Sequence, residues 1–442
     1  MSFCFFHFSA TFADFIMQIK LNRKKSPPMR DIAIPALSPP QCYRLDNGIP
    51  VYAVHLGTQD ILKVEVVFNS GRPDEHRPIA ARATAAMLKE GTYSRTSAEI
   101  AEHIDFYGGS FSVPTQLDTS NIILCCLTKH FSKLLSLLED LLHCPSFPQR
   151  ELDIFIENNI QRLQIELTKN EVLAYRKITE LIFGEQHPYG YNSFPDTYSS
   201  LTRGDLQKHF DEKFNPDICS IFLSGKISED TIDQLNAHLG QRKTRSLVQP
   251  VLILPQTLMP EKIKIVNSDT TQTAVKIGCR MFNRLHEDYN GMFVLNTVLG
   301  GYFGSRLMAN IREEKGFTYN IYSSFDTMLH DGYFYVSTEV GNDFVEATRE
   351  EIYKEMHRLQ TEPIGEAELQ MLRNYLLGNL LTLVDGPFNI ADTIKTLLTE
   401  NANIEHFHSL GNSIKNIQAD ELQALAQKYF QPEKMWEVIV GV

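Results

Sequence analysis

DLQKHFDEKFNPDICSIFLSG, Asp205–Gly225, recurs at the end of the chain as ELQALAQKYFQPEKMWEVIVG, Glu421–Gly441. The two stretches align without a gap over 21 residues at an offset of 216 (421 − 205). Each pattern predicts an amphipathic helix, a turn marked by proline, and an apolar strand closed by glycine. Identical pairs are Leu206/Leu422, Gln207/Gln423, Phe214/Phe430, Pro216/Pro432 and Gly225/Gly441. A gapless match of this length indicates an internal duplication rather than chance similarity.

The duplication predicts two homologous domains, as does a length of 442 residues, which exceeds a single ordinary core. We expect them at residues 41–240 and 259–442. The linker is expected at 241–258, where QRKTRSLVQPVLILPQTL combines a basic run with two prolines. Residues 1–40 are expected to be an N-terminal extension that is disordered or lies partly upstream of a true start at Met29.

Strands and helices are predicted in the same order in both halves. The first half has strands at Ile49–Leu56 and Leu62–Asn69, and helices at Ile79–Leu88, Ser97–Tyr107, Ser132–Leu142 and Gln149–Thr168. The second half has strands at Ile263–Val266 and Thr273–Cys279, then helices from Asp288 and near Ser305–Glu314. Strands that follow strands, with helix pairs between them, predict an α+β fold and not a doubly wound parallel sheet.

The composition limits the classes of function that the chain can have. The chain is 43% apolar and 22% charged, which is typical of a soluble globular protein. Its formal charge of −12 argues against a nucleic-acid surface and would favour the approach of a basic peptide. Seven scattered cysteines without a CxxC pair indicate buried thiols in a reducing compartment. We therefore expect a cytoplasmic location, with the periplasm as the alternative, and no membrane span.

FNSGRPDEHRPIAARATAAMLKEGT, Phe68–Thr92, resembles the zinc-motif region of the insulinase, pitrilysin and mitochondrial processing-peptidase family. In that family a helix carries H-x-x-E-H before a Gly-Thr pair. Histidines four residues apart share one helix face and bind zinc, and the glutamate activates water. Anchored on Gly91-Thr92, the five positions here are Arg82-Ala83-Thr84-Ala85-Ala86. Both histidine ligands and the general base are missing.

The resemblance also implies a third ligand, a glutamate within Gln149–Thr168. Gln164 matches that position best, and Glu166 remains open. Since a zinc site needs three protein ligands, we expect no metal on this chain. His406 and His408 form the only close histidine pair, which we interpret as a solvated surface.

LGGYFGSRLMANIREEKGFTYNIYSSF, Leu299–Phe325, predicts a glycine turn, a helix from about Ser305 to Gly316, and a strand from Phe317. A phosphate-binding loop is set aside because no G-K-[ST] follows. By themselves, Arg312 and Tyr319 would be ordinary surface and strand residues. The stretch resembles the family's C-terminal signature, however, in which Arg and Tyr lie seven residues apart. That resemblance implies that Tyr319 donates to the oxyanion and that Arg312 anchors the substrate.

The resemblance therefore implies the non-zinc-binding subunit of a heterodimeric metallopeptidase. Arg312 and Tyr319 would act in trans, while an H-x-x-E-H partner would carry the zinc and hydrolyse peptides. An inert structural or binding homologue is the alternative, because the family fold also occurs in core subunits of a respiratory complex. An active peptidase with a relocated site is a third hypothesis, for which the sequence shows no ligand set.

Overall fold

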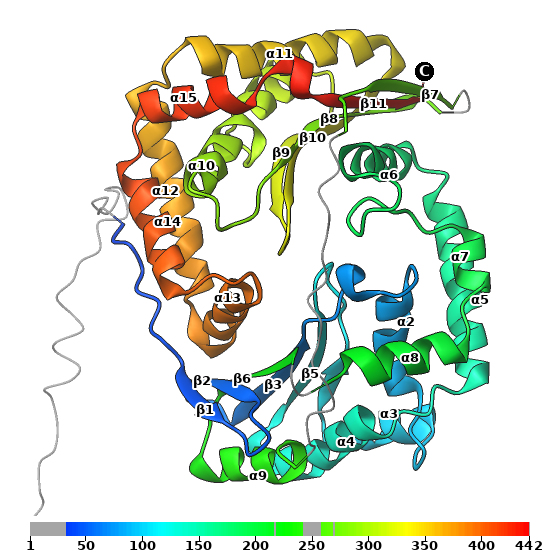
Figure 1. The fold of residues 1–442 in the computed structure, drawn as a ribbon. Helices are drawn as coiled ribbons and strands as arrows, with labels where there is room; N and C mark the ends of the chain where they lie inside the picture. Colours follow the sequence, from blue (N-terminus) through cyan, green and yellow to red (C-terminus); the bar gives the residue numbers. More distant parts are fainter. Residues whose placement is uncertain (1–31, 216–217, 242–257, 268–269, 442) are drawn as a thin grey trace, which may run out of the picture. The chain divides into compact units, whose positions relative to one another are not determined.

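Two β-sheets organise the chain (Figure 1). The computed structural model describes residues 32–215, 218–241, 258–267 and 270–441. From Ile34 onward they form one unit, with one sheet in each predicted half. The α+β class and the two-half architecture are thus confirmed. Residues 242–257, nearly all of the expected linker, lie outside the described residues.

From β2 onward, the first sheet has the same strand order as the second, and β1 is an additional edge strand. The first is β1-β2-β6-β3-β5-β4 and the second is β7-β11-β8-β10-β9. In both, the last strand of the half is parallel to one neighbour and antiparallel to the other: β6 lies between β2 and β3, and β11 between β7 and β8. The strands of the first sheet are β1 Gln41–Arg44, β2 Pro50–His55, β3 Ile61–Phe68, β4 Ser110–Ser112, β5 Ser120–Leu127 and β6 Cys219–Gly225. Those of the second are β7 Lys262–Val266, β8 Gln272–Met281, β9 Ile321–Thr327, β10 Gly332–Gly341 and β11 Trp436–Gly441.

The repeated stretches form the same unit twice. Helices α8 (Arg203–Lys213) and α15 (Ala419–Tyr429) differ by 216 residues at both ends (419 − 203 and 429 − 213). Each leads into the strand that occupies the equivalent place in its sheet. Gly225 and Gly441 close these strands at φ of 112° and 147°, where a side chain would be strained. A Cβ at Gly225 would also lie 2.2 Å from the carbonyl oxygen of Ile61.

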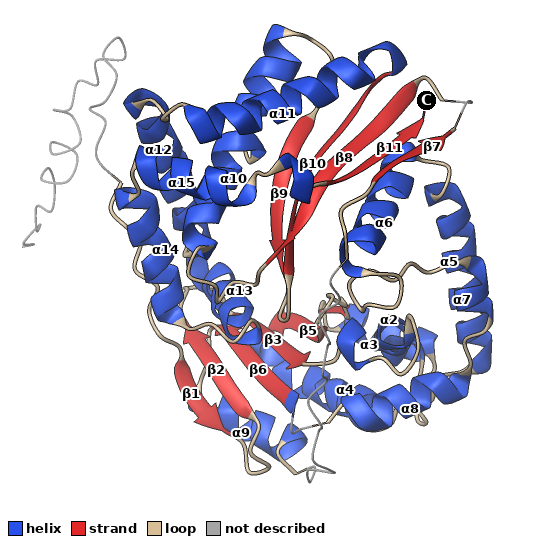
Figure 2. Cartoon of the chain, turned by 45° about the horizontal axis from the view of Figure 1, so that its top comes forward, coloured by secondary structure: helices blue, strands red, loops and turns tan. Residues whose placement is uncertain are grey.

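In each half, one helix packs on the sheet of the other half (Figure 2). Helix α6 (Asn170–Phe183) belongs to the first half but packs on β8 and β11. Helix α13 (Gly386–Thr399) lies 216 residues later and packs on β2 and β6. This reciprocal exchange explains why the two halves form one unit.

The remaining helices follow the predicted order closely. Those of the first half are α2 Ala80–Met87, α3 Ser97–Phe106, α4 Phe131–His143, α5 Gln149–Glu166, α7 Pro195–Ser199 and α9 Glu229–Leu239. Those of the second half are α10 Tyr289–Gly300, α11 Val345–Thr361, α12 Glu366–Leu383 and α14 Ile404–Asn416. None of the described helices is long and apolar enough to cross a membrane.

Two predicted boundaries need correction. The folded part begins before residue 41, because Leu37 is buried and Ile34 packs close to Gly411. The strand predicted from Phe317 begins only at Ile321. There the Thr318 hydroxyl donates to the Glu339 carbonyl at 2.7 Å, so a side chain occupies an acceptor that backbone pairing would otherwise use.

Candidate functional site

Helix α2, which contains the positions Arg82–Ala86 compared above with the zinc motif, is built for packing and not for metal binding. Ala83, Thr84 and Ala85 are fully buried, and α2 packs against α8. The Thr84 hydroxyl donates to the carbonyl of Leu206 on that helix at 3.4 Å. Arg82 points outward instead and donates to the amide oxygen of Asn159 at 3.3 Å. Small side chains at the former motif positions therefore allow a close helix contact.

The start of α2 is closed by a buried carboxyl group. Glu75 accepts hydrogen bonds from the backbone N–H of Ala81 at 2.9 Å and of Ile79 at 3.2 Å, and from the Tyr191 hydroxyl at 2.7 Å. These bonds satisfy N–H groups that a helix start leaves free. Burial raises the pKa of Glu75 to about 7, despite the hydrogen bonds from Tyr191 and Ala81. Ile79 itself has φ of 66°, which strains a β-branched residue.

A zinc ion does not fit this site. An arginine and alanines stand where the family has ligands and base, and the guanidinium of Arg82 would repel a cation. Among the described residues, no group of three His, Cys, Asp or Glu side chains is arranged to hold a metal ion. We therefore derive no chemical step on this chain from a metal.

One face of α5, the helix expected to carry the third ligand position, lines a pocket of about 410 Å³ beside α2. The residues of α5 that line it are Asn159, Arg162, Leu163 and Glu166, at helical spacing. Gln164, the residue that the sequence favoured, is exposed and does not line the pocket. Glu166 does line it, but it pairs with Lys169 at 2.8 Å. Asn159 is the residue that contacts the motif helix, and sequence comparison missed it.

The two histidines of the HxH pair cannot act together on a metal. His406 and His408 lie on α14, where side chains two residues apart point to different sides. His406 bonds instead to Asn403, the residue that caps this helix, at 2.7 Å between Nδ1 and Oδ1.

Arg312 and Tyr319 do come together, on the surface of the second half. The Arg312 guanidinium lies 5.3 Å from the centre of the Tyr319 ring and 4.7 Å from that of Phe303. Tyr319 is 87% exposed, and no described residue makes a hydrogen bond to its hydroxyl. Phe303 is also largely exposed. It was not predicted, although an aromatic residue within the Gly301–Gly304 turn was the available signal.

Arg312 sits on a π-helical segment, η5 (Met308–Glu314). The Lys315 N–H donates to the Asn310 carbonyl at 3.0 Å, five residues back. Gly316 then ends the segment at φ of 65°, as predicted for the end of this helix. π-Helical turns are rare in proteins as a whole, but those that occur are often found at functional sites. They change the direction in which the following side chains point. Here the turn brings Arg312 and Tyr319 into contact across Gly316.

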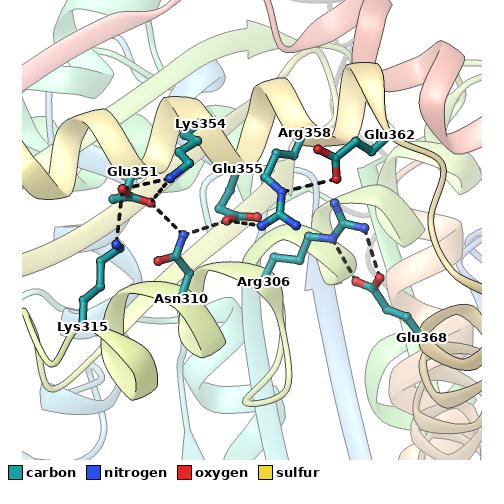
Figure 3. A network of polar contacts seen from close by, with 9 residues as sticks. All are labelled: Arg306, Asn310, Lys315, Glu351, Lys354, Glu355, Arg358, Glu362 and Glu368. Carbon is teal, nitrogen blue, oxygen red and sulfur yellow. Dashed lines mark hydrogen bonds and ion pairs between the residues drawn. The ribbon is translucent and has the colours of Figure 1, made fainter.

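A network of polar contacts to α11 and α12 holds η5 in place (Figure 3). The Asn310 amide donates to Glu355 at 2.7 Å and to Glu351 at 2.9 Å, both on α11. Glu355 is only 1% exposed and also accepts from Arg358 at 3.0 Å. Just before η5, Arg306 makes a two-pronged pair with Glu368 of α12, at 2.9 and 3.0 Å. Since charge-assisted bonds of this kind are directional, they fix the orientation of the segment that carries Arg312.

The two candidate centres remain separate within the chain. Neither Arg312 nor Tyr319 lines the pocket beside α2. The exposed Arg312–Tyr319 pair and the pocket beside α2 are thus two distinct features of the chain.

Comparison with known proteins agrees with this division. Residues 200–376 match the family described as the Peptidase M16 inactive domain. This stretch of the chain is therefore similar to that domain. The chain is also 24% identical over 350 residues to the uncharacterized zinc protease YmxG of Bacillus subtilis, covering 78% of this chain and 84% of that protein.

One relative is described as a non-peptidase and one solved structure as an inactive domain. The chain is 24% identical to the non-peptidase homolog YmxG of Helicobacter pylori, covering 77% of each chain. Its fold matches the crystal structure of a peptidase M16 inactive domain from Pseudomonas fluorescens with a TM-score of 0.82. That match has 21% identity and covers 91% of this chain and 98% of the other. The predicted family resemblance is confirmed.

Proposed function

We propose that this M16 homologue is the non-zinc-binding subunit of a two-subunit peptidase. One observation carries the proposal: Arg312 and Tyr319 are held in contact on an exposed surface, while the motif helix has lost every ligand. If the whole machinery had decayed together, nothing would preserve a π-helical turn and its supporting network. The asymmetry is expected of a chain whose second half acts on a site that another chain provides.

In this proposal a homologous partner with an intact H-x-x-E-H helix carries the zinc ion and the general base. The zinc supplies Lewis-acid and water-activating chemistry. The residues of this chain bind the peptide substrate and orient it. The Tyr319 hydroxyl has no partner among the described residues, so it is free to donate to the carbonyl oxygen of the scissile bond as negative charge develops. Arg312 holds a carbonyl or carboxylate of the peptide.

Tyr319 needs a partner surface for this role. At 87% exposure it is surrounded by water, where a hydrogen bond contributes little. Enclosure between two subunits would exclude that water and strengthen the interaction with the substrate. The same enclosure would cover Phe303, whose exposed ring needs no other explanation in the isolated chain.

Reconstitution tests the proposal. The purified chain should cleave no peptide and contain no stoichiometric zinc, and cleavage should appear when an H-x-x-E-H homologue from the same organism is added. Analytical ultracentrifugation should show a 1:1 complex. Full turnover by the isolated chain would contradict the proposal. If the two proteins associate but the Tyr319→Phe variant supports cleavage as well as the wild type, the chain is a scaffold, which is the remaining alternative.

A further inference from the structure

The pocket beside α2 contains an unusual concentration of positive charge. Its lining includes four arginines from four different elements, namely Arg72, Arg82, Arg162 and Arg176. Its only acidic lining residue is Glu166, which already pairs with Lys169. None of the four guanidinium groups forms an ion pair with a carboxylate among the described residues. The pocket is therefore cationic.

Two of the arginines are fixed in place by neutral partners. Arg72 donates to the carbonyls of Pro188 and Tyr191 at 3.3 Å and lies 4.3 Å from the centre of the Tyr191 ring. Arg176 donates to the Ser193 carbonyl at 2.5 Å and lies over the Phe194 ring. These contacts orient the guanidinium groups without pairing them directly with a carboxylate. Burial and nearby Arg72 lower the pKa of Arg176, whereas Tyr198 and Glu180 oppose that shift.

The other two arginines face solvent. Arg162 has no hydrogen-bond or ion-pair partner among the described residues, and Arg82 has only the 3.3 Å bond to Asn159. A ligand can therefore reach both without displacing any existing ion pair. Planar guanidinium groups bind carboxylates with two parallel hydrogen bonds, which a lysine cannot do.

The acidic groups next to the pocket do not neutralise it. Glu75 accepts from Tyr191, and burial keeps its carboxyl largely protonated up to about pH 7. Asp118 accepts from the Tyr189 hydroxyl and from the Leu329 N–H, and burial raises its pKa. Asp74 pairs with Lys213 at 3.1 Å, and Glu180 with Lys177 at 2.5 Å. Each of these carboxyl groups thus already has a hydrogen-bond or ion-pair partner.

We propose that the pocket beside α2 binds carboxylate groups of an acidic peptide. The four guanidinium groups supply the charge, and the tyrosine rings of Tyr175, Tyr198 and Tyr333 supply surfaces for neighbouring side chains. A bare inorganic anion would leave those rings uncovered, which favours a peptide. The chain's formal charge of −12 repels acidic peptides at long range, so binding depends on the local arginines. It needs no second subunit and would stand if the proposed pairing failed.

Fluorescence anisotropy with the full-length isolated chain tests this proposal. The probe is a fluorescein-labelled hexapeptide that contains three glutamates and has an amidated C-terminus. The comparison peptides replace glutamate by lysine, or replace it by glutamine and keep a free C-terminal carboxylate. Binding of either carboxylate-bearing peptide supports the proposal and shows which carboxylate the pocket takes. The lysine peptide should not bind.

Variants on one helix provide the matched comparison. Arg162→Gln should weaken binding of the glutamate peptide by a factor on the order of 10, as for the loss of one charge-assisted hydrogen bond. Arg82→Gln should have a similar effect. Arg150→Gln changes the same charge on an exposed part of α5 outside the pocket and should leave affinity unchanged. Equal losses in Arg150→Gln and Arg162→Gln, or no binding of either carboxylate peptide, would overturn the proposal.

Discussion

Glu65 and Lys276 occupy the same position in the two halves and carry opposite charges. Glu65 on β3 lies opposite Phe222, and Lys276 on β8 lies opposite Val438, which is 216 residues after Phe222 (438 − 222). Each side chain is buried and binds the helix of the other half that packs on its sheet. Lys395 of α13 donates to Glu65 at 2.8 Å, and Lys276 donates to Glu171 of α6 at 2.9 Å.

This inversion gives each sheet a preference for the correct helix. If α6 packed on the first sheet, Glu171 would approach Glu65, and if α13 packed on the second sheet, Lys395 would approach Lys276. Both arrangements would bury like charges, which costs several kcal/mol. Two sheets of similar construction therefore remain distinguishable, although from β2 and β7 onward their strand orders are the same.

The Lys276–Glu171 pair should respond asymmetrically to substitution. Glu171→Gln leaves the fully buried Lys276 without its carboxylate and should reduce the free energy of unfolding by about 3 kcal/mol. Lys276→Met should cost less, about 1 kcal/mol or below, because Glu171 is 36% exposed and can be rehydrated. Urea denaturation at neutral pH measures both. As a control, Lys264→Met removes an exposed pair with Glu346 and should change stability by at most about 1 kcal/mol. A larger loss in Lys276→Met than in Glu171→Gln would contradict the argument.

Tyr319→Phe should separate activity from stability. In the reconstituted pair, loss of the hydroxyl should lower kcat by a factor on the order of 10² with little change in KM, because the bond forms only as charge develops. The melting temperature should not change, since Tyr319 is 87% exposed and makes no hydrogen bond to a described residue. Tyr93→Phe, at another exposed tyrosine, is the matched control and should leave kcat unaltered.

Asn310 is expected to be a positioning residue. Asn310→Ala removes two hydrogen bonds to carboxylates and should reduce the free energy of unfolding by about 1–3 kcal/mol. In the reconstituted pair, kcat should fall more than KM changes, because Arg312 and Tyr319 lose their fixed orientation. Asn374→Ala, at an exposed residue of α12, should alter neither. If Asn310→Ala lost stability but kept full kcat, the network would be purely structural.

The repeat and most helices could be predicted because they are local patterns. The match of Asp205–Gly225 to Glu421–Gly441 places two helices and two strands correctly. The exchange of α6 and α13 could not be predicted, because periodicity shows which face of a helix is apolar but not which sheet it covers. The prediction of a strand from Phe317 was wrong for a related reason. The alternation of side chains includes residues before Ile321, but there the Thr318 hydroxyl binds the Glu339 carbonyl of β10.

The candidate site, too, could be predicted only in part. The missing ligands at Arg82–Ala86 and the spacing of Arg312 and Tyr319 can be read directly from the sequence. Contact between Arg312 and Phe303 depends on a π-helical turn, which has no simple sequence signature. The arginines of the pocket are dispersed from Arg72 to Arg176 and meet only through the packing of α2, α5 and α6.

Glu75 should make stability depend on pH in a direction unusual for a carboxyl group. Its folded pKa of about 7 exceeds the ordinary 4.5, so the folded state retains a proton that the unfolded chain releases. The resulting stabilisation is complete below pH 4.5 and is lost as pH rises through 7, a change of about 3 kcal/mol. Glu75→Gln has no such titration, so between pH 4.5 and 8 it should gain stability relative to the wild type by this amount. Glu99→Gln provides a control, because the Thr96 N–H lowers the pKa of Glu99 and its contribution to stability is lost mainly below pH 4.5, so the difference from the wild type should change little between pH 4.5 and 8. Urea denaturation of the three proteins at both pH values measures the differences, and parallel curves for Glu75→Gln and wild type would show that folding does not raise the pKa of Glu75.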